Sequence, residues 1–460
     1  MKRKIITTIV ESKGAPSITK KTRTLTDGQK AALEDMKTLG TNIFITGQAG
    51  TGKSYIIREY VNWCKTVERK CAITSTTGIS ACLIGGTTLH AWAGIGLGEE
   101  DPKMLLAKVV KNKRAVKRWK KVDTLIIDEV SMLKPSLLEK LDYIGMQIRG
   151  LCSPLGGIQL ILCGDFAQLP PIESDFLFKV EIWNRCVTKI HCLQENIRQT
   201  DPVFQKLLAE VRLGKVTETT KDILLSCLSR KAEEDIKPTK IYPKKVDVEK
   251  INRKRLIDLK KKGAESKIFK ADDQIVSKFS SVRLADRVKT DYLNRADKMF
   301  QVPAILELCI GAQVILTTNH DVGGGLCNGS RGVIRDFRDG LPSVLFRNGI
   351  TVPMAHKTTK YKIDENVTVT RSQIPLILGF ASTVHKSQGS TLDCASVDLG
   401  PNVFENGQAY TALSRVRSLD SLFVECIDFS RISARKDVVE FYEKLIPGKE
   451  KITSFFPIKK

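Results

Sequence analysis

The sequence predicts an α/β protein with two lobes, each built around a parallel β-sheet. Three observations predict it. Short apolar runs rich in β-branched residues alternate with segments of helical period, which is typical of parallel strands buried on both faces. This alternation occurs twice along the chain. The length of 460 residues leaves room for two to four domains of about 150 residues each.

The composition favours a folded protein with a polyanionic partner. Hydrophobic residues make up 42% of the chain, which is enough to form a core. Lys and Arg number 74 against 51 Asp and Glu, so the formal net charge is +23. Nucleic acid is the expected partner of so basic a chain. A highly soluble basic protein without such a partner is the alternative.

Cysteine usage and hydropathy indicate the compartment. The twelve cysteines are scattered without a C-x-x-C pair, and only five histidines accompany them, so neither a zinc site nor a disulfide framework is expected. No run approaches the ~18 apolar residues of a membrane span, and residues 1–14 lack the apolar core of a signal peptide. We expect an intracellular, soluble protein without a membrane partner.

The expected domains follow in chain order. Residues 1–23 carry seven basic residues and one acid without any period, which indicates a flexible basic arm. Residues 24–200 form the first domain and residues 201–446 the second, whereas the tail 447–460 fits no core pattern. The candidate strands are residues 42–46, 71–76, 124–127 and 158–163 in the first domain, and 312–316, 377–382 and 422–425 in the second.

Two insertions interrupt this plan. Within residues 97–121, the segment 103–121 holds nine basic residues and no acid, with Leu105, Leu106, Val109, Val110 and Val116 spaced for one apolar helix face. It predicts a small basic subdomain, and a solvated charged helix is the alternative. Residues 333–373 alternate short strands with Asp-Gly and Asn-Gly turns, which predicts a small β-barrel or hairpin module.

A phosphate-binding loop follows the first predicted strand. Residues 47–54, GQAGTGKS, match G-x-x-x-x-G-K-[ST] between a strand and a helix beginning near Ser54. Glycines let the backbone N–H groups and the helix N-terminus approach phosphate closely. Lys53 is then expected to reach the β- and γ-phosphates of a nucleotide, and Ser54 to bind Mg²⁺.

Paired carboxylates end another predicted strand. In Leu125-Ile126-Ile127-Asp128-Glu129, the two acids stand at the carboxyl end of a strand, where a phosphate-loop domain needs them. We expect Asp128 to hold the Mg²⁺ shell and Glu129 to polarise the attacking water. The alternative is that these two acids, like most acids that follow a strand, belong to a solvated loop.

Three further residues are candidates for contact with the transferred phosphoryl group. Gln168 follows the apolar strand 158–163 and can hydrogen-bond the γ-phosphate or the water. Arg198 and Arg415 are candidate arginine fingers, because a planar guanidinium stabilises charge on the transferring phosphoryl. Spacing alone leaves open that either arginine is a surface ion-pair partner.

With these residues in place, the chain resembles the PIF-type (petite integration frequency) DNA helicases of the superfamily-one class that moves 5′ to 3′. The resemblance covers nearly all of residues 25–424. Its specific stretches are TSTTG (74–78), GGTTLHAWAGIG (85–96), PLGGIQL (154–160) leading into Gly164-Asp165, TVHKSQG (383–389) and GQAYTALSR (407–415).

The resemblance implies two RecA-like domains that close on ATP and Mg²⁺, with Gln29 reading adenine and with Arg198 and Arg415 crossing from the second lobe. Residues at the nucleotide would be Gly47, Gly50, Thr51, Gly52, Lys53, Ser54, Gln388 and Gly389, and residues near single-stranded DNA would be Thr77, His90, Trp92, Thr383 and His385. The basic insertion would be the strand-separating wedge. Core packing is the alternative for Trp92 and for both histidines.

These inferences predict an ATP-dependent helicase that acts on single-stranded DNA and forked duplex in replication, repair or recombination. We expect a monomer in the nucleus or at another site of DNA replication, or in the cytoplasm if the protein is viral. The alternatives are a translocase that does not unwind DNA and an adaptor with an inactive phosphate loop. A nucleotide kinase is disfavoured because no lid or acceptor site is evident.

The tail carries a last candidate site. Ile452 and Phe455 lie three residues apart, on one side of a helical turn, and Phe456 is adjacent. This apolar plug resembles the docking peptide of proteins that bind the PCNA-type sliding clamp, although Lys449 stands where that motif has glutamine. The alternative is that both phenylalanines fold back onto the second lobe.

Overall fold

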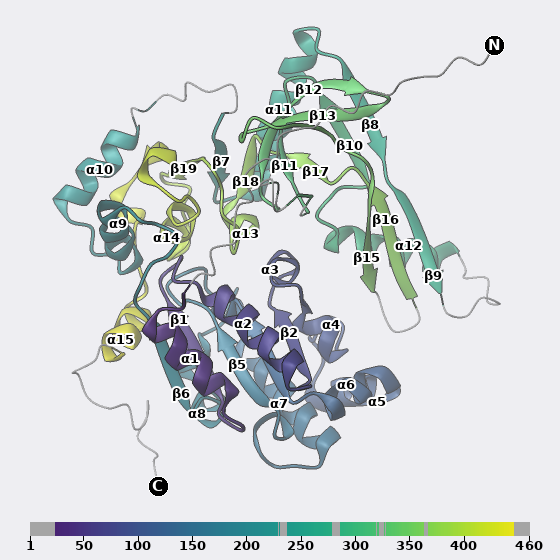
Figure 1. Ribbon diagram of the computed structural model, residues 1–460, viewed down its shortest axis with the longest axis vertical. Helices are drawn as coiled ribbons and strands as arrows, with labels where there is room; N and C mark the ends of the chain where they lie inside the picture. Colours follow the sequence, from purple (N-terminus) through teal and green to yellow (C-terminus); the bar gives the residue numbers. More distant parts are fainter. Residues whose placement is uncertain are drawn as a thin grey trace, which may run out of the picture.

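The computed structural model describes residues 24–228, 230, 237–277, 286–318, 320–321, 326, 328–362 and 367–445. The predicted arm 1–23 and the tail with Ile452, Phe455 and Phe456 lie outside these residues. Figure 1 shows a first α/β lobe in purple and blue, a second parallel sheet beside it, and a group of antiparallel strands at the far end of the second lobe. No helix within the described part of the chain has the length and apolar character to span a bilayer.

The first lobe is built on a six-stranded parallel sheet in the order β3-β2-β4-β5-β1-β6. The strands are β1 (Ile43–Gly47), β2 (Cys71–Ser75), β3 (Thr87–Thr88), β4 (Thr124–Asp128), β5 (Gln159–Cys163) and β6 (Lys189–Leu193). The helices are α1 (Asp27–Lys37), α2 (Lys53–Thr66), α3 (Gly78–Leu83), α4 (Leu89–Ala93), α7 (Pro135–Arg149) and α8 (Glu181–Cys186). The four strands predicted for this lobe are confirmed to within a residue. Central strands β1, β4 and β5 are buried along their whole length, as their apolar sequences require.

The basic insertion, predicted as a small basic subdomain, is a helical hairpin. It consists of α5 (Pro102–Lys111) and α6 (Lys113–Lys121), which meet at Asn112. The Asn112 backbone N–H donates to Val109 O, and this bond ends α5. The Asn112 side chain accepts from the Ala115 N–H, and this bond begins α6. The break turns Trp119 into the core and leaves Val110 exposed. Capping by Asn112 therefore divides this segment into two helices, although the spacing of its apolar residues is continuous.

The second lobe has a four-stranded parallel sheet in the order β18-β7-β19-β20. Its strands are β7 (Thr239–Tyr242), β18 (Ala381–Thr383), β19 (Ala395–Leu399) and β20 (Leu422–Ile427). The helices after β6 are α9 (Pro202–Arg212), α10 (Glu218–Leu228), α11 (Lys245–Lys261), α13 (Val384–Ser387), α14 (Gln408–Leu413) and α15 (Lys436–Lys444). The predicted strand at 422–425 is confirmed as part of β20.

The remaining strands form the antiparallel insertion, which begins far earlier than the predicted module at 333–373. It contains β8 (Ser266–Lys270), β9 (Asp272–Ser277), α12 (Asp286–Met299), β10 (Ile305–Cys309), β11 (Gln313–Leu316), β12 (Arg331–Arg338), β13 (Leu341–Phe346), β14 (Thr351–Pro353), β15 (Lys357–Lys362), β16 (Val367–Gln373) and β17 (Leu376–Leu378). These strands make sheets of five, three and two strands.

Two strand assignments were therefore wrong. The run at 312–316 was predicted in the second parallel sheet, but β11 pairs antiparallel with β12 and β17. The run at 377–382 divides between antiparallel β17 and parallel β18. Apolar runs buried on both faces look alike in either kind of sheet, so the sequence pattern could not separate them.

The last described helix, α15, packs against the first lobe, although it lies within the predicted second domain. The Phe441 ring lies 4.5 Å from that of Phe178 and 5.5 Å from that of Phe166. Phe44 and Trp183 belong to the same aromatic cluster. The second domain predicted at 201–446 thus ends in a helix that completes the core of the first lobe.

Candidate nucleotide site and DNA track

A cavity of about 430 Å³ lies between the two lobes. Its lining from the first lobe is Ala49, Gly50, Gly52, Lys53, Ser54, Tyr55, Arg58, Asp128, Glu129, Gln168, Ile197 and Arg198, and from the second lobe it is Gly389, Thr391, Arg415 and Arg417. All six residues predicted as catalytic are in this set. Gly47, Thr51, Gln29 and Gln388 are close to the cavity without lining it.

The phosphate loop joins β1 to α2, as predicted. Gly50 and Gly52 have φ angles of 93° and 83°, which L side chains rarely adopt. A Cβ atom at Gly50 would lie 2.4 Å from Gln199 Oε1. The Lys53 ammonium donates to the main-chain oxygens of Gly47 and Gln48 at 2.7 and 2.9 Å. The loop therefore holds its cation over a ring of backbone groups, at the N-terminus of α2.

The carboxylates of Asp128 and Glu129 stand where β4 ends. Asp128 is buried, and its Oδ1 accepts a 2.9 Å bond from the Glu129 N–H. Burial, together with the neighbouring Glu129 charge, raises the pKa of Asp128 to about 7. A cation near Asp128 would relieve both effects. Glu129 has a φ of 55°, an uncommon value for a non-glycine residue, which turns its side chain toward the second lobe.

Glu129 is the carboxylate that joins the lobes. Its Oε2 accepts a 3.0 Å bond from Gln388 Nε2, at the end of α13. A Cβ atom built on Gly389 would lie 3.2 Å from Glu129 Oε1 and 3.8 Å from Ser80 Cβ. The chain leaving α13 therefore lies directly against the first lobe. The second lobe thus positions a group that the first lobe supplies.

Gln168 is buried at the turn that follows β5. Its backbone N–H donates to Asp165 O at 2.9 Å. Its side-chain Oε1 is buried without a hydrogen-bond partner, beside Lys53 and Glu129 in the cavity lining. A buried polar atom without a partner is costly unless a ligand or water satisfies it. This atom fits the predicted contact with a phosphate or a water.

The two arginines come from different lobes, so the prediction that both cross from the second lobe was wrong for Arg198. It follows β6, and its backbone N–H donates to Gly50 O at 3.1 Å, which fixes it to the phosphate loop. Its Nη1 donates to Ser414 O at 3.1 Å. Burial, with help from neighbouring Arg415, lowers the pKa of Arg198 to about 9.

Arg415 is the second-lobe arginine. It is 2% exposed, and its Nε donates to Thr411 O at 2.7 Å within the turn that ends α14. Burial lowers its pKa, and the Glu129 carboxylate opposes this effect. Both guanidinium groups are thus held in a desolvated setting by main-chain oxygens. A developing negative charge in the cavity would be stabilised there more strongly than in water.

Gln29 lies behind the phosphate loop. With Thr26 it forms a capping box at the start of α1, and its Nε2 donates to Thr51 O at 2.9 Å. The side chain is buried, and both ends of its amide have protein partners. The contact with adenine stays a prediction.

Sequence reasoning missed a buried polar hub at Asp165. The carboxylate accepts from Arg212 at 2.9 Å, from the Tyr410 hydroxyl at 3.1 Å and from the Tyr442 hydroxyl at 3.0 Å. Tyr410 in turn accepts from the Ala49 N–H of the phosphate loop at 2.7 Å. Burial alone would raise the pKa of Asp165, but the Arg212 guanidinium outweighs it and holds the pKa below its ordinary value.

This hub ties three second-lobe helices to the first-lobe sheet. Arg212, Tyr410 and Tyr442 come from α9, α14 and α15, and Asp165 follows β5. The signal in the sequence was Asp165 itself, an acid directly after an apolar strand that no role had explained. Its partners lie up to 277 residues away along the chain, so no local pattern could identify them.

Three of the five predicted DNA contacts, Thr77, Thr383 and His385, lie at or beside the starts of α3 and α13. Thr77 accepts from the Ser80 N–H at the start of α3, and Thr383 accepts from the Lys386 N–H at the start of α13. Figure 1 places α3 and α13 opposite each other. Burial lowers the pKa of His90 and of His385, which favours neutral imidazoles at these positions. Their contacts with DNA stay predictions.

Trp92 is a core residue, which corrects its assignment as a base-stacking platform. It is 7% exposed, and its ring lies 4.7 Å from that of Trp119 in the basic hairpin. Arg118 Nε donates to Trp92 O at 2.8 Å. A stacking platform must expose at least one face of its ring to bases, and this buried indole instead holds α4 against α6.

Comparison with protein families gives two matches. A model described as PIF1-like helicase matches residues 24–222, and one described as the 2B domain of DNA helicase Pif1 matches residues 291–337. The second match begins inside α12 and ends inside β12, within the antiparallel insertion.

Curated relatives cover most of the chain. The ATP-dependent DNA helicase PIF1 of Danio rerio is 39% identical over 417 residues, covering 88% of this chain and 62% of the relative. The human protein of that name is 38% identical, with 89% and 62% covered. Uncharacterized protein 030L of Invertebrate iridescent virus 6 is 35% identical, with 88% and 91% covered. The chain thus spans about six-tenths of the length of the vertebrate relatives.

Solved structures match most of this chain. The Pif1 helicase of Candida albicans is 34% identical, with a TM-score of 0.77, and the match covers 92% of this chain and 100% of that one. The Pif1 helicase from Bacteroides in complex with ADP-AlF3 and single-stranded DNA is 27% identical, with a TM-score of 0.65 and coverage of 92% and 97%.

Proposed function

Because the chain belongs to the PIF1-like helicase family, we propose that it is an ATP-driven DNA helicase that moves 5′ to 3′ on single-stranded DNA and unwinds duplexes. The observation that carries the proposal is the cavity between the lobes, where a phosphate loop and two carboxylates face Arg415 of the other lobe, and where Gln388 of that lobe bonds Glu129. The direction of movement rests on the family alone.

The residues suit hydrolysis of ATP with Mg²⁺. The backbone of the phosphate loop and Lys53 would hold the phosphates, and Ser54 and Asp128 would hold the metal, whose role is to neutralise charge on the β- and γ-phosphates. Glu129 would orient the attacking water, and Gln168 would contact that water or the γ-phosphate through its partnerless oxygen. Arg198 and Arg415 would stabilise charge on the transferring phosphoryl group.

Hydrolysis would be coupled to movement along DNA through the N-terminal ends of α3 and α13. Each lobe carries one of these elements, and the Glu129–Gln388 bond links α13 to the hydrolytic carboxylate. A motor needs two DNA-binding surfaces whose relative affinity depends on the nucleotide state. Opening the duplex opposes the motor by about 1.4 kcal/mol per base-pair step.

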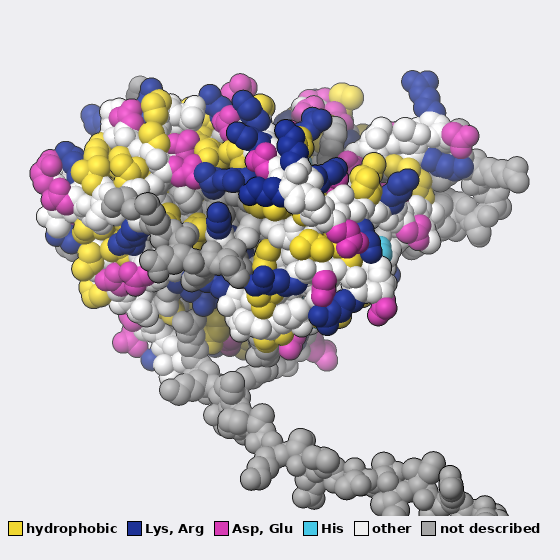
Figure 2. Space-filling model, turned by 90° about the horizontal axis from the view of Figure 1, so that it is seen from above, with side chains coloured by type: hydrophobic (Ala, Val, Ile, Leu, Met, Phe, Trp, Pro, Cys, Tyr) yellow, Lys and Arg dark blue, Asp and Glu magenta, His cyan; other side chains and the backbone are white. Residues whose placement is uncertain are grey.

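Basic side chains supply non-specific contacts in this proposal. Figure 2 views the molecule from above, on the side where α11 and the outer antiparallel strands lie in Figure 1, and Lys and Arg gather near the middle of this face. Exposed cations of α11 include Lys250, Arg253, Lys254 and Lys261. The α5–α6 hairpin would act as the wedge that separates strands.

Further parts of the proposal concern partners and place. The protein would act as a monomer on forked DNA, in the nucleus or at another site of replication, or in the cytoplasm of an infected cell if it is viral. The tail would dock on a PCNA-type sliding clamp through Ile452, Phe455 and Phe456. The Candida albicans and Bacteroides structures support the helicase part of this proposal, and the clamp rests on the sequence of the tail.

The test is unwinding of a forked duplex that carries either a 5′ or a 3′ single-stranded tail, with ATP hydrolysis followed in parallel. We expect unwinding of the 5′-tailed substrate only. Hydrolysis and protein displacement without unwinding would favour the translocase. An absence of DNA-stimulated hydrolysis would favour the adaptor.

The clamp has its own test. The double substitution Phe455→Ala/Phe456→Ala should abolish binding to the cognate clamp and leave DNA-stimulated hydrolysis intact. Unchanged clamp affinity with a lower melting temperature would instead indicate that the phenylalanines fold back on the second lobe.

A further inference from the structure

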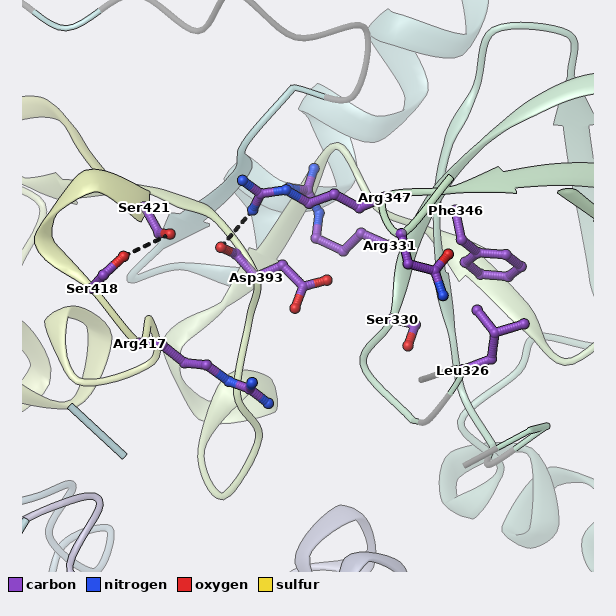
Figure 3. A pocket seen from close by; sticks show the side chains of 10 residues that line it. Leu326, Ser330, Arg331, Phe346, Arg347, Asp393, Arg417, Ser418 and Ser421 are labelled. Carbon is purple, nitrogen blue, oxygen red and sulfur yellow. Dashed lines mark hydrogen bonds between the residues drawn. The ribbon is translucent and has the colours of Figure 1, made fainter. Parts of the chain in front are cut away.

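A second cavity of about 430 Å³ lies between the parallel sheet of the second lobe and the antiparallel insertion (Figure 3). Its polar and charged lining is Ser330, Arg331, Arg347, Asn348, Asp393, Arg417, Ser418 and Ser421, with Leu326 and Phe346 beside it. Three guanidinium groups against one carboxylate give this cavity a net positive charge. Its chemistry therefore suits a small anion.

The cavity adjoins the nucleotide site and lies away from the predicted DNA contacts. Arg417 lines both cavities. Asp393 and Ser421 precede β19 and β20 by one or two residues, at the edge where those strands begin, whereas Thr383 stands where β18 ends. Since the strands are parallel, these are opposite edges of the sheet. An anion here would arrive from the nucleotide rather than from the DNA.

Two of the three arginines, Arg331 and Arg347, are held in place before any ligand binds. Arg331 is 1% exposed, and its Nη1 donates to Cys394 O at 3.2 Å. Arg347 Nη1 donates to Asp393 O at 2.6 Å. Figure 3 shows the Asp393 carboxylate lying between the side chains of Arg347 and Arg417. The Ser418 and Ser421 hydroxyls are 3.1 Å apart on the same side and can donate to an oxyanion.

We propose that this cavity binds inorganic phosphate as it leaves the nucleotide site, with Arg417 shared between the two positions. The inference rests on the proposed hydrolysis of ATP. In that reaction the water oxygen bonds to the γ-phosphorus as the bond to the β–γ bridging oxygen breaks, so that ADP, hydrogen phosphate and one proton are produced. Arginine forks and hydroxyls match the tetrahedral oxygens of that product. Asp393 limits how tightly the anion is held.

Binding is tested without hydrolysis. The full chain is saturated with a non-hydrolysable ATP analogue, Mg²⁺ and single-stranded DNA, which blocks the γ-phosphate position, and inorganic phosphate is titrated by ³¹P NMR. We expect saturable line broadening. Arg347→Gln should weaken phosphate binding about tenfold, the scale of one charged hydrogen bond, and Asp393→Asn should strengthen it. Arg347→Lys, which keeps the charge, should lie closer to the wild type.

Opposite signs for the two neutralising variants separate the proposal from simple misfolding, which would weaken binding in both. The melting temperature and the affinity for the ATP analogue should change little, because neither residue lines the nucleotide cavity. Loss of phosphate binding when the analogue is bound, or weaker binding in both variants, would overturn the proposal.

A second experiment measures the kinetics of phosphate release. In a single turnover of ATP, a fluorescent phosphate sensor should report release that lags behind cleavage, and Asp393→Asn should lengthen the lag. An unchanged lag in this variant would contradict the transit role even if phosphate binds. Failure of the wild type to hydrolyse ATP would instead refute the proposed function, and the NMR titration would still report on the site.

Discussion

The two lobes line one cavity but contribute to it in different ways. The first lobe brings the phosphate loop, both carboxylates, Gln168 and Arg198, all at or after the ends of strands of one sheet. The second lobe brings Arg415 to the cavity from the end of α14, and Gln388, at the end of α13, bonds Glu129 beside the cavity. In the proposed function, the first lobe supplies most of the contacts to the nucleotide. The second supplies groups that complete its chemistry only when the lobes are together.

Because of this difference, we expect substitutions in the two lobes to affect ATP binding and ATP turnover differently. Substitutions in the phosphate loop should affect both, whereas those in the second lobe should affect turnover and its dependence on DNA. Arg198 lies between these classes, because it is fixed to Gly50 of the phosphate loop and reaches Ser414 of the second lobe.

The largest expected effect is that of Lys53→Ala. The substitution removes the cation that would contact the β- and γ-phosphates, so hydrolysis should be abolished. Affinity for single-stranded DNA should stay within a few-fold of the wild type, because the DNA contacts lie on other elements. Steady-state hydrolysis and fluorescence anisotropy with labelled DNA measure the two quantities. Normal turnover in this variant would remove the phosphate loop from the mechanism.

The next effect sharpens the comparison between the lobes. Arg198→Ala and Arg415→Ala should each lower turnover roughly 10³-fold while ATP still binds, which is the scale of a lost arginine finger. Fluorescent nucleotide binding and single-turnover hydrolysis measure the two steps. If either variant keeps normal DNA-stimulated turnover, that arginine is structural.

A matched pair of substitutions tests the Asp165 hub. Tyr410→Phe and Tyr442→Phe each remove a hydroxyl that accepts a buried backbone N–H, from Ala49 and from Phe166 respectively. Each should lower the free energy of unfolding by about 1–3 kcal/mol in urea titrations. Only Tyr410 contacts the phosphate loop, so only its variant should raise the KM for ATP. Equal KM values in the two variants would argue against coupling through Tyr410.

The smallest effect concerns DNA affinity after Trp92→Leu. A lost stacking platform would cost about 1–3 kcal/mol per base. Since the indole packs on Trp119, we expect DNA affinity within about twofold of the wild type and a lower melting temperature. Trp119→Leu is the control and should behave alike. A large loss of DNA affinity in Trp92→Leu alone would restore the stacking role.

The first lobe was the more predictable region of the chain. Period and motif were sufficient for four of its six strands, its phosphate loop and the acids at the end of β4, whereas β3 and β6 were not predicted. Lys53, Asp128, Glu129, Gln168, Arg198 and Arg415 do meet in one cavity, although their spacing alone had left both arginines open. Arg58 was missed, yet it stands one helical turn after Ser54 and lines the same cavity.

What could not be predicted depends on contacts between distant residues. The direction of pairing of β11 is set by β12 and β17, not by its own apolar sequence. The burial of Trp92 depends on Trp119, which arrives there only because Asn112 reverses the chain. The hub at Asp165 needs tyrosines from two helices near the end of the described chain. Each of these outcomes is decided by tertiary structure rather than by local propensity.

The packing of α15 has a consequence for how the protein is made. The first-lobe sheet is complete once β6 has been synthesised, but Phe441 and Tyr442 belong to its core and to the Asp165 hub. They follow β6 by roughly 250 residues, which take roughly 12–50 s to translate at about 5–20 residues per second. During this interval, the emerging first lobe exposes the aromatic groove around Phe44 and Phe178. Chaperones that bind exposed aromatic surface on nascent chains would have their binding site there, and its closure would mark the completion of the first lobe.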